Sequence, residues 1–521
     1  MTKPQCLKRI RAAISSLSQL GILSFLLMGC IRPAVSADWP QWRGPNRDGV
    51  APESPPLADA WPPGDPKLVW RVDKLMNGGQ ETGHSSPVIA NGRVYLYGYW
   101  RDAGTPDGAY DAIACLSTNS GSVLWRSIFP AVAGKCEPRD QGSTPCVVGG
   151  RLYLAGRLRA YCLDAMTGKL LWQQPTGDTN LVWAIASSFA VVDGVAIMIC
   201  AGVYGFDAVT GQIRWHREEA PGPWNPDGSG AGSLSSPVCW RHAGKDYVVC
   251  CVKSAELMDP ATGGTIWKIP WTRGAWSSWN GHSSPAIIGD QMVLLEIDGG
   301  MEGYPLSLDA PTKLWHIPDH DCGTSPLIYE GHVYTIGGGD YSKPTSIRCA
   351  DLQTGAIDWE KPTQPQGCSS PIAADGKIFG YLQFGRLLCM WKADPNHYTV
   401  LAATPVNADG YSSPAFADGR LFLRLNDGVA CYDVTRAANP TAREAQEALR
   451  PKILENQAKA LRANQEGAAR GDAYGEYRMG QRYRDGDGVP KDLTKAREWL
   501  EKAASQGIKD AARELTELPD K

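Results

Sequence analysis

Most of this chain alternates between short apolar runs and short polar turns. The clearest examples are ANGRVYLYG, GGRLYLAG and ADGRLFLRL, in which a turn containing Gly joins or precedes an apolar run. Apolar runs of this length, separated by tight polar turns with Gly, are typical of β-strands joined as hairpins. The pattern continues from residue 85 to about residue 433, so this part of the chain is predicted to be all-β.

A short motif, Ser-Ser-Pro or a close variant, precedes the first apolar run of each unit. Its eight copies begin at Ser85, Ser143, Ser187, Ser235, Ser283, Thr324, Ser369 and Ser412. Successive copies start 58, 44, 48, 48, 41, 45 and 43 residues apart, a period typical of four-stranded propeller blades. The spacing predicts an eight-bladed β-propeller.

The third strand of most units ends in a polar turn that is followed by a Trp at fixed spacing. Clear copies are DAMTGKLLW, DAVTGQIRW, DPATGGTIW and DLQTGAIDW. Asp and Thr side chains bond the backbone of such turns, and Gly adopts a positive φ there. A large aromatic side chain repeated in each blade is expected to fill the wedge between neighbouring sheets. The residues concerned are Trp125, Trp172, Trp215, Trp267, Trp315 and Trp359.

The eighth unit stops after three strands, at CYDVT, while an unassigned strand, LVWRV, precedes the first unit. We expect residues 68–73 to complete the eighth blade, with Trp70 in the docking position. Closure of the ring would remove the exposed strand edges of an open array.

These turns, the Ser-Ser-Pro starts, the number of blades and the late closing strand resemble the pyrroloquinoline-quinone-like (PQQ-like, BamB-like) β-propeller repeat family, over residues 68–437. The lead-in at residues 38–67, which opens DWPQWRGPNRDGV, is also similar to exported propellers of this type. The resemblance implies either of two functions. One is a quinoprotein dehydrogenase that holds the quinone and calcium in its central funnel; the other is a non-enzymatic lipoprotein scaffold for outer-membrane assembly. The fold alone does not choose between them.

The composition changes near residue 441 to residues that favour helix. A linker is expected at residues 438–452 and a helical region at 453–521. The segment AARGDAYGEYRMGQRYRDGDGVPKDLTKAREWLEKAASQGIKDAARELTEL resembles a Sel-type, tetratricopeptide-like repeat. One complete repeat is fewer than an independent solenoid needs, so we expect it to dock on the propeller, to use helix 453–469 as a cap, or to bind a partner. Such repeats commonly bind proteins, which favours an adaptor.

The first 37 residues are typical of an export signal, because basic residues precede an apolar stretch that is too short to span a bilayer. Two processing sites are compatible with the sequence. Cleavage after Ala37 would release a soluble chain, whereas the run Leu27-Met28-Gly29-Cys30 resembles a lipobox, which would leave residues 1–29 as the signal and a lipid on Cys30. Both predict a periplasmic or outer-membrane-associated protein.

The net charge of the chain and the positions of its cysteines limit the possible partners and bonds further. The chain has 52 Lys and Arg against 55 Asp and Glu, a net charge of −3, and loss of the first 37 residues would make it −8. Nucleic acid is therefore excluded as an expected partner. Export permits disulfides, yet five cysteines share one repeat position, where a small buried residue is needed: Cys115, Cys162, Cys349, Cys389 and Cys431.

The pair Cys250-Cys251 is the one local feature that favours an enzyme, because alcohol-oxidising quinoproteins carry a vicinal disulfide beside the cofactor. The pair lies within DYVVCCVKSAELMD, which is predicted to be the second strand of the fourth blade rather than a funnel loop. The interpretation as a packing pair is therefore preferred.

The loops before the Ser-Ser-Pro motifs are expected to converge at one mouth of the propeller. They are rich in aromatic, imidazole and carboxylate groups, which suit a sugar, a quinone, a peptide or a metal. The candidates are His84, Asp227, Trp276, Trp279, His282, Asp319, His320, Asp321 and Tyr411. No nucleophile elbow, phosphate loop or zinc spacing is apparent, so no catalytic residue is assigned.

The sequence thus favours an exported, non-catalytic scaffold of the cell envelope whose partners are envelope proteins. No cofactor is expected, because a quinone with three carboxylates needs cationic partners, and Arg139 and Arg273 are the only obvious ones in comparable loops. The alternatives are a PQQ- and calcium-dependent alcohol or sugar dehydrogenase, and a propeller that binds carbohydrate through Trp276 and Trp279.

Overall fold

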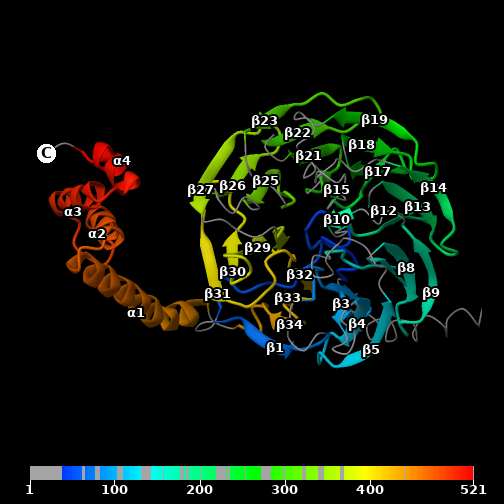
Figure 1. Cartoon of the computed structure of the whole chain (residues 1–521), viewed down its shortest axis with the longest axis horizontal. Coiled ribbons are helices and arrows are strands. Elements are labelled where there is room, and N and C mark those ends of the chain that lie inside the picture. Colours follow the sequence, from blue (N-terminus) through cyan, green and yellow to red (C-terminus); the bar gives the residue numbers. More distant parts are fainter. Residues whose placement is uncertain are drawn as a thin grey trace, which may run out of the picture.

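The computed structural model of the chain is mostly β-strand, followed by four helices (Figure 1). It describes residues 38–61, 65–76, 82–101, 109–130, 142–156, 158–176, 181–183, 187–200, 202–218, 230–231, 235–252, 254–270, 283–296, 300–318, 324–337, 345–363, 369–439 and 442–519. Within these ranges, no helix has the length and apolar character needed to cross a bilayer.

Eight four-stranded antiparallel sheets, the blades, surround a common axis (Figure 1). The first blade contains β2 (Val88–Ala90), β3 (Arg93–Arg101), β4 (Ala109–Ser117) and β5 (Val123–Pro130); the second contains β6 (Cys146–Val148), β7 (Arg151–Gly156), β8 (Arg159–Asp164) and β9 (Leu170–Pro175). The third contains β11 (Ala190–Val192), β12 (Val195–Ile199), β13 (Val203–Asp207) and β14 (Ile213–Arg217); the fourth contains β16 (Val238–His242), β17 (Lys245–Cys251), β18 (Ser254–Met258) and β19 (Thr265–Pro270).

The second half of the ring repeats this arrangement. The fifth blade contains β20 (Ala286–Ile288), β21 (Gln291–Glu296), β22 (Gly300–Pro305) and β23 (Trp315–Ile317); the sixth contains β24 (Leu327–Tyr329), β25 (His332–Ile336), β26 (Thr345–Asp351) and β27 (Ile357–Thr363). The seventh contains β28 (Ile372–Ala374), β29 (Lys377–Leu382), β30 (Leu387–Lys392) and β31 (Val400–Pro405). A short parallel pair, β10 (Leu181–Trp183) and β15 (Gly230–Ala231), lies outside the blades.

The eighth blade closes the ring as the sequence predicts. Its first three strands are β32 (Ala415–Ala417), β33 (Arg420–Leu425) and β34 (Gly428–Asp433), and its fourth is the N-terminal strand β1 (Lys67–Val72). The strand β1 pairs antiparallel with β34, which places Trp70 opposite Cys431. The predicted eight-bladed propeller closed by an N-terminal strand is therefore confirmed.

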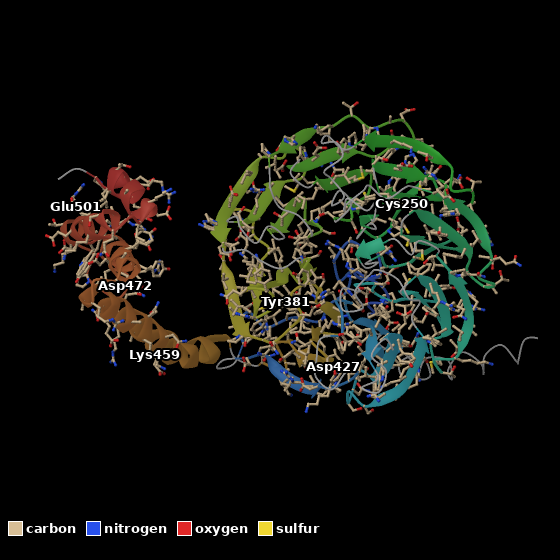
Figure 2. All side chains as sticks on the ribbon, viewed as in Figure 1. Cys250, Tyr381, Asp427, Lys459, Asp472 and Glu501 are labelled. Atoms are coloured by element: carbon tan, nitrogen blue, oxygen red, sulfur yellow. The ribbon has the colours of Figure 1, made fainter. Side chains whose placement is uncertain are left out.

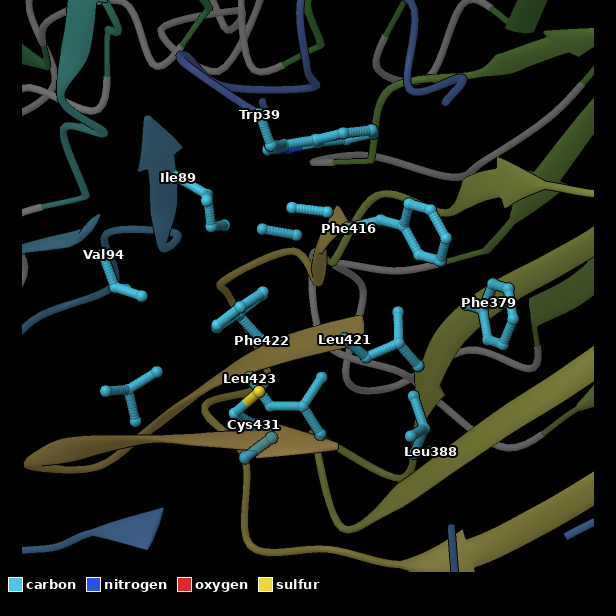
Figure 3. Close-up of a cluster of buried hydrophobic side chains, with 14 of the residues drawn as sticks. Trp39, Ile89, Val94, Phe379, Leu388, Phe416, Leu421, Phe422, Leu423 and Cys431 are labelled. Carbon is cyan, nitrogen blue, oxygen red and sulfur yellow. The ribbon is translucent and has the colours of Figure 1, made fainter. Parts of the chain in front are cut away.

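In most blades, a small residue on the third strand makes room for the repeated Trp on the fourth strand; the fourth blade instead has Leu257 opposite Trp267. Cys115 lies opposite Trp125, and Gly205 lies opposite Trp215. A Cβ atom on Gly205 would come within 2.1 Å of the Trp215 ring, so a larger side chain would displace the indole. None of the described cysteines forms a disulfide, and most are fully buried in clusters such as the one in Figure 3, where they act as small apolar residues.

The Ser-Ser-Pro motif links the blades around the axis. In seven of the eight junctions within the described residues, the second residue of the motif donates its backbone N–H to the hydroxyl of the same residue in the next blade, at 2.8–3.1 Å. These hydroxyls are buried, so each bond satisfies a backbone donor that water does not reach. The motif recurs because, at these junctions, the hydroxyl of each copy accepts the backbone N–H of the copy in the preceding blade.

The propeller has two distinct faces. The hairpin between the first two strands of a blade lies beside the turn between the last two, since Ala165 donates its N–H to Gly150 O and Ala208 to Gly194 O. We call this side the turn face. The Ser-Ser-Pro motifs precede the innermost strands at the opposite ends of the blades, and we call that side the mouth face.

Four helices follow the propeller: α1 (Ala442–Ala469), α2 (Ala473–Asp485), α3 (Leu493–Ser505) and α4 (Lys509–Glu517). The helix α1 begins inside the segment 438–452 that we expected to be a linker. Gly475 brings α2 against the backbone of Ala468, and Gly480 brings it against Leu500 of α3. The side chains of Asp472 and Asp492, at the N-caps of α2 and α3, accept backbone N–H groups.

Candidate functional site

Two of the predicted mouth residues, His84 and Tyr411, lie within the described residues. They come from the first and eighth blades, which closure of the ring makes neighbours, and their rings are 4.6 Å apart between centroids. The other candidates lie outside the described residues: Asp227, Trp276, Trp279, His282, Asp319, His320 and Asp321.

A buried carboxylate, Asp409, holds His84 in place. Its Oδ1 lies 3.1 Å from His84 Nδ1, and its Oδ2 accepts the backbone N–H of Ser412 at 3.1 Å. His84 is partly exposed, whereas Asp409 is almost fully buried. The pair joins the first blade to the last at the mouth face.

Arg424 packs beneath this pair with no exposed surface. Its guanidinium donates to Ser85 O at 3.1 Å, Tyr97 O at 2.7 Å and Thr82 Oγ1 at 2.8 Å. Burial alone would raise the pKa of Asp409, but the charges of His84 and Arg424 and the N–H of Tyr411 outweigh it, so the pKa lies below its usual value. Asp409 therefore carries its negative charge in a largely dry environment.

The cluster His84, Asp409 and Tyr411 offers an oriented imidazole beside an aromatic ring. Such a group recognises a polar ligand by hydrogen bonding and stacking. Within the described ranges, no group of three or more His, Cys, Asp or Glu side chains converges as metal ligands do. Sequence reasoning missed Asp409, although it stands in NADGYSSP, two residues before Tyr411, in the loop class that supplied the other candidates.

At the opposite end of the axis, the lead-in segment lies across the ring. Trp39 exchanges backbone hydrogen bonds with Ile89 in the first blade, and Pro40 O accepts from Val147 in the second. The N–H of Ala51 then donates to Ala373 O in the seventh blade. Figure 3 shows Trp39 near Ile89 and Phe416 in the buried cluster that joins the first and last blades. The segment 38–51 therefore covers the propeller axis at the turn face.

Two arginines fix this plug segment (residues 38–51) to three blades, the third, fourth and sixth. Arg43 donates to Ser325 O at 2.9 Å and Pro326 O at 2.7 Å, and burial lowers its pKa to about 10 against the opposing effect of Asp48. Arg47 donates to Pro237 O at 3.1 Å and to Ser188 O at 3.4 Å. Both guanidiniums are buried, so their charge is used to hold the chain's own carbonyl groups.

The pair Cys250 and Cys251 lies on β17, in the second strand of the fourth blade (Figure 2). Neither cysteine forms a disulfide, and both are buried. Burial raises the pKa of Cys251 to about 12 and that of Cys250 well above its usual value. Because adjacent strand residues face opposite sides of a sheet, the two thiols contribute to two different inter-blade packing layers.

The repeated Trp residues lie on outer strands, and most of them contact the turn of the next blade. Trp215 Nε1 donates to Pro260 O at 3.0 Å, while the ring lies under Gly263. The indoles of Trp70, Trp172, Trp267, Trp315 and Trp359 donate to backbone carbonyls in the same way, and Trp125 lies under Gly168. Each of these rings therefore fixes one blade to the next.

These features define an eight-bladed β-propeller that is closed by its N-terminal strand, plugged at one end and followed by a helical repeat. Residues 60–256 match the family model described as outer membrane protein assembly factor BamB, and residues 473–508 match the Sel1 repeat. The chain thus combines a PQQ-like, BamB-like propeller with a Sel1 repeat.

Two similar proteins of known function are quinone-dependent enzymes. The dehydrogenase subunit of a quinone alcohol dehydrogenase from Gluconobacter oxydans is 29% identical over 224 residues, which cover 39% of this chain and 26% of that protein. A quinohemoprotein alcohol dehydrogenase from Pseudomonas putida is 31% identical over 172 residues, which cover 30% and 22%. The matched part of this chain thus spans about a quarter of the relatives' length.

Solved structures of low sequence identity share the fold. The quinohemoprotein alcohol dehydrogenase from Comamonas testosteroni superposes with a TM-score of 0.59 at 14% identity, covering 76% of this chain and 80% of that one. A europium-containing methanol dehydrogenase gives 0.54 at 13% identity, covering 78% and 93%.

The buried arginines that the structure describes near the axis are bonded to the chain itself. A quinone with three carboxylates needs cationic or hydrogen-bonding partners. The buried guanidiniums of Arg43, Arg47 and Arg424 donate to the chain's own carbonyl and hydroxyl groups, and the thiols of Cys250 and Cys251 are not joined. Arg139 and Arg273 lie outside the described residues.

Proposed function

We propose that this protein is an exported, non-catalytic scaffold of the cell envelope, in which the propeller and the helical repeat present protein-binding surfaces. The observation that carries the proposal is the use of the axial cations: Arg43, Arg47 and Arg424 bond the fold's own carbonyl groups. The second support is the Sel1 repeat, whose helix α2 exposes Tyr474 to 61%.

The proposal includes the place of the protein and its domains. It is periplasmic or outer-membrane-associated after loss of residues 1–37, or of residues 1–29 if Cys30 is lipidated. The lead-in covers 38–67, the propeller 68–437, and the repeat region the helices that follow. The cluster His84, Asp409 and Tyr411 is the proposed ligand-binding part of the mouth face, and no cofactor is needed.

A partner-capture experiment tests the proposal. The full chain and a Tyr474→Glu variant are cross-linked in living cells, and the covalent products are purified and identified. We expect a defined envelope protein with the natural chain and much less of it with Tyr474→Glu, while Leu493→Glu, an exposed change on α3, keeps it. Failure to capture any partner through either domain would count against a scaffold.

Two other functions remain as alternatives. The relatives named as quinone alcohol dehydrogenases favour a PQQ- and calcium-dependent oxidoreductase. A carbohydrate-binding propeller is supported by the Trp-rich sequence that contains Trp276 and Trp279. Glycan-array binding that is lost in a Trp276→Ala, Trp279→Ala double variant would establish the carbohydrate function in place of the scaffold.

A further inference from the structure

The guanidinium of Arg47 is only partly used by the bonds that hold the plug segment. Its Nε donates to Gln41 Oε1 at 2.9 Å, and its Nη1 donates to Pro237 O at 3.1 Å and to Ser188 O at 3.4 Å. Nη2 is buried, yet it has no hydrogen-bond partner among the residues that the structure describes. The N–H groups of Nη2 are therefore buried donors of a charged group without an acceptor, an arrangement that is costly unless something binds there.

Arg47 also lacks a countercharge, since no carboxylate in the described part of the chain forms an ion pair with it. Burial lowers its pKa, and the largest opposing effects come from the thiols of Cys146, Cys239 and Cys250. These thiols are protonated at neutral pH, because burial raises the pKa of Cys146 to about 11 and the pKa values of Cys239 and Cys250 above the usual value. The positive charge of Arg47 therefore faces neutral groups in the interior of the propeller.

The two other buried arginines at the axis do have a carboxylate near them. Asp48 opposes the effect of burial on the pKa of Arg43, and both Nη groups of Arg43 donate to carbonyl oxygens. The charge of Arg424 helps to keep the pKa of Asp409 low against the effect of burial. Arg47 is thus the exception among three guanidiniums in similar surroundings, and its bonds to carbonyl groups explain only part of its burial.

The backbone fixes the Arg47 guanidinium in place. Arg47 has a φ of 61°, in the left-handed region that residues other than Gly rarely adopt. Such a conformation persists only where the surrounding structure determines it. Here the N–H of Arg47 donates to Gly44 O at 3.2 Å, and the N–H of Gly49 donates to Arg43 O at 2.9 Å. The donors of Nη2 are therefore oriented before any ligand binds, which favours a charge-assisted hydrogen bond.

We propose that Nη2 of Arg47 binds one small monovalent anion, such as chloride, in the interior of the propeller. The anion would accept the unused N–H groups and neutralise the guanidinium, as a buried charge requires. A water molecule would accept the same N–H groups but would leave the charge unpaired. Arg47 is only 1% exposed, so the anion must be small enough to be enclosed. The inference is independent of the proposed function, and it makes the position of the plug segment depend on an anion.

Thermal unfolding of the full chain in chloride and in gluconate, at matched pH and ionic strength, measures the effect of the anion. Gluconate is the reference salt because it is too large for an enclosed site. We expect chloride to raise the melting temperature by roughly 2–4 °C in a saturable way, since a ligand that binds only the folded chain stabilises it by mass action. Equal melting temperatures in the two salts would overturn the proposal.

Two variants connect the chloride response to Arg47. Arg47→Met keeps much of the length of the side chain but removes the charge and the donors, so its melting temperature should no longer depend on chloride. Arg43→Met is the matched control, because it removes the neighbouring anchor of the same plug segment. This variant should melt at a lower temperature than the natural chain and keep the full chloride response. A response that survives Arg47→Met, or that is lost equally in both variants, would contradict a site at Nη2.

Crystals of the natural chain grown in bromide locate the anion without any substitution, and they decide the question if Arg47→Met does not fold. We expect an anomalous-scattering peak for bromide at hydrogen-bonding distance from Arg47 Nη2 and none beside Arg43. Electron density for water alone at Nη2, or bromide only on the surface of the protein, would show that the guanidinium holds no anion.

Discussion

The backbone N–H of Ser413 donates to Oγ of Ser86 at 2.9 Å, which joins the last blade to the first. Replacing Ser86 by Ala removes the acceptor and leaves a buried donor unsatisfied, so we expect a loss of about 1–3 kcal/mol in the free energy of unfolding. Urea denaturation measures it. Ser188→Ala is the matched control, since the Ser188 hydroxyl is buried with no hydrogen-bond partner; that change should stay within about 0.5 kcal/mol of the natural chain.

A substitution in the polar turn of the fourth blade tests whether that turn packs on Trp215 of the third blade. Gly263 has a φ of +68°, and an added Cβ would lie 2.6 Å from the Trp215 ring. Gly244 has a φ of +81° with nothing within 4 Å of the added atom. We expect Gly263→Ala to cost about 1–3 kcal/mol more than Gly244→Ala, because only the first overpacks the wedge. Equal losses in thermal unfolding would contradict the docking role of Trp215.

The carboxylate of Asp409, at the mouth face, makes the stability of the folded chain depend on pH in a predictable direction. The pKa of Asp409 is lower in the folded chain than its usual value, so its contribution to stability is present above that value and is lost as the pH falls through the folded pKa. We expect His84→Gln to raise the pKa of Asp409 and to start the acid loss at a higher pH. Urea midpoints measured from pH 7 down to about pH 3 should show this shift, and an unchanged profile would remove His84 as the partner.

Processing at the N-terminus is a separate prediction. If Cys30 is the mature N-terminus, mass spectrometry of the membrane fraction should find an acylated Cys30. A soluble product that begins at Asp38 would exclude lipidation.

The closed ring could be predicted from the sequence because the blades repeat the same pattern of strands, turns and packing residues. The Trp that recurs after most polar turns, the small residue opposite it in all but the fourth blade, and the unassigned strand with Trp70 all result from packing between neighbouring blades. The linker prediction was incomplete, since α1 already begins at Ala442.

The plug segment could not be predicted in the same way. Arg43 and Arg47 lie in a stretch without regular secondary structure, and their partners are up to 283 residues away. Such long-range contacts leave no repeated pattern of hydrophobic and polar residues in the sequence. The two Trp and two Arg residues between Trp39 and Arg47, interspersed with Gly and Pro, were the only signal of a buried, irregular segment. At the mouth, His84 and Tyr411 were identified by loop class, whereas Asp409 becomes important only because closure of the ring places it beside His84.

We propose a scaffold rather than a quinone enzyme, and an assay of quinone binding and turnover distinguishes the two. The purified chain is mixed with pyrroloquinoline quinone and calcium, and its melting temperature and its dye-linked alcohol oxidation are followed together. We expect neither to change, because the described cations at the axis are bonded to the chain's own carbonyl groups. A saturable rise in melting temperature accompanied by turnover would contradict the scaffold account.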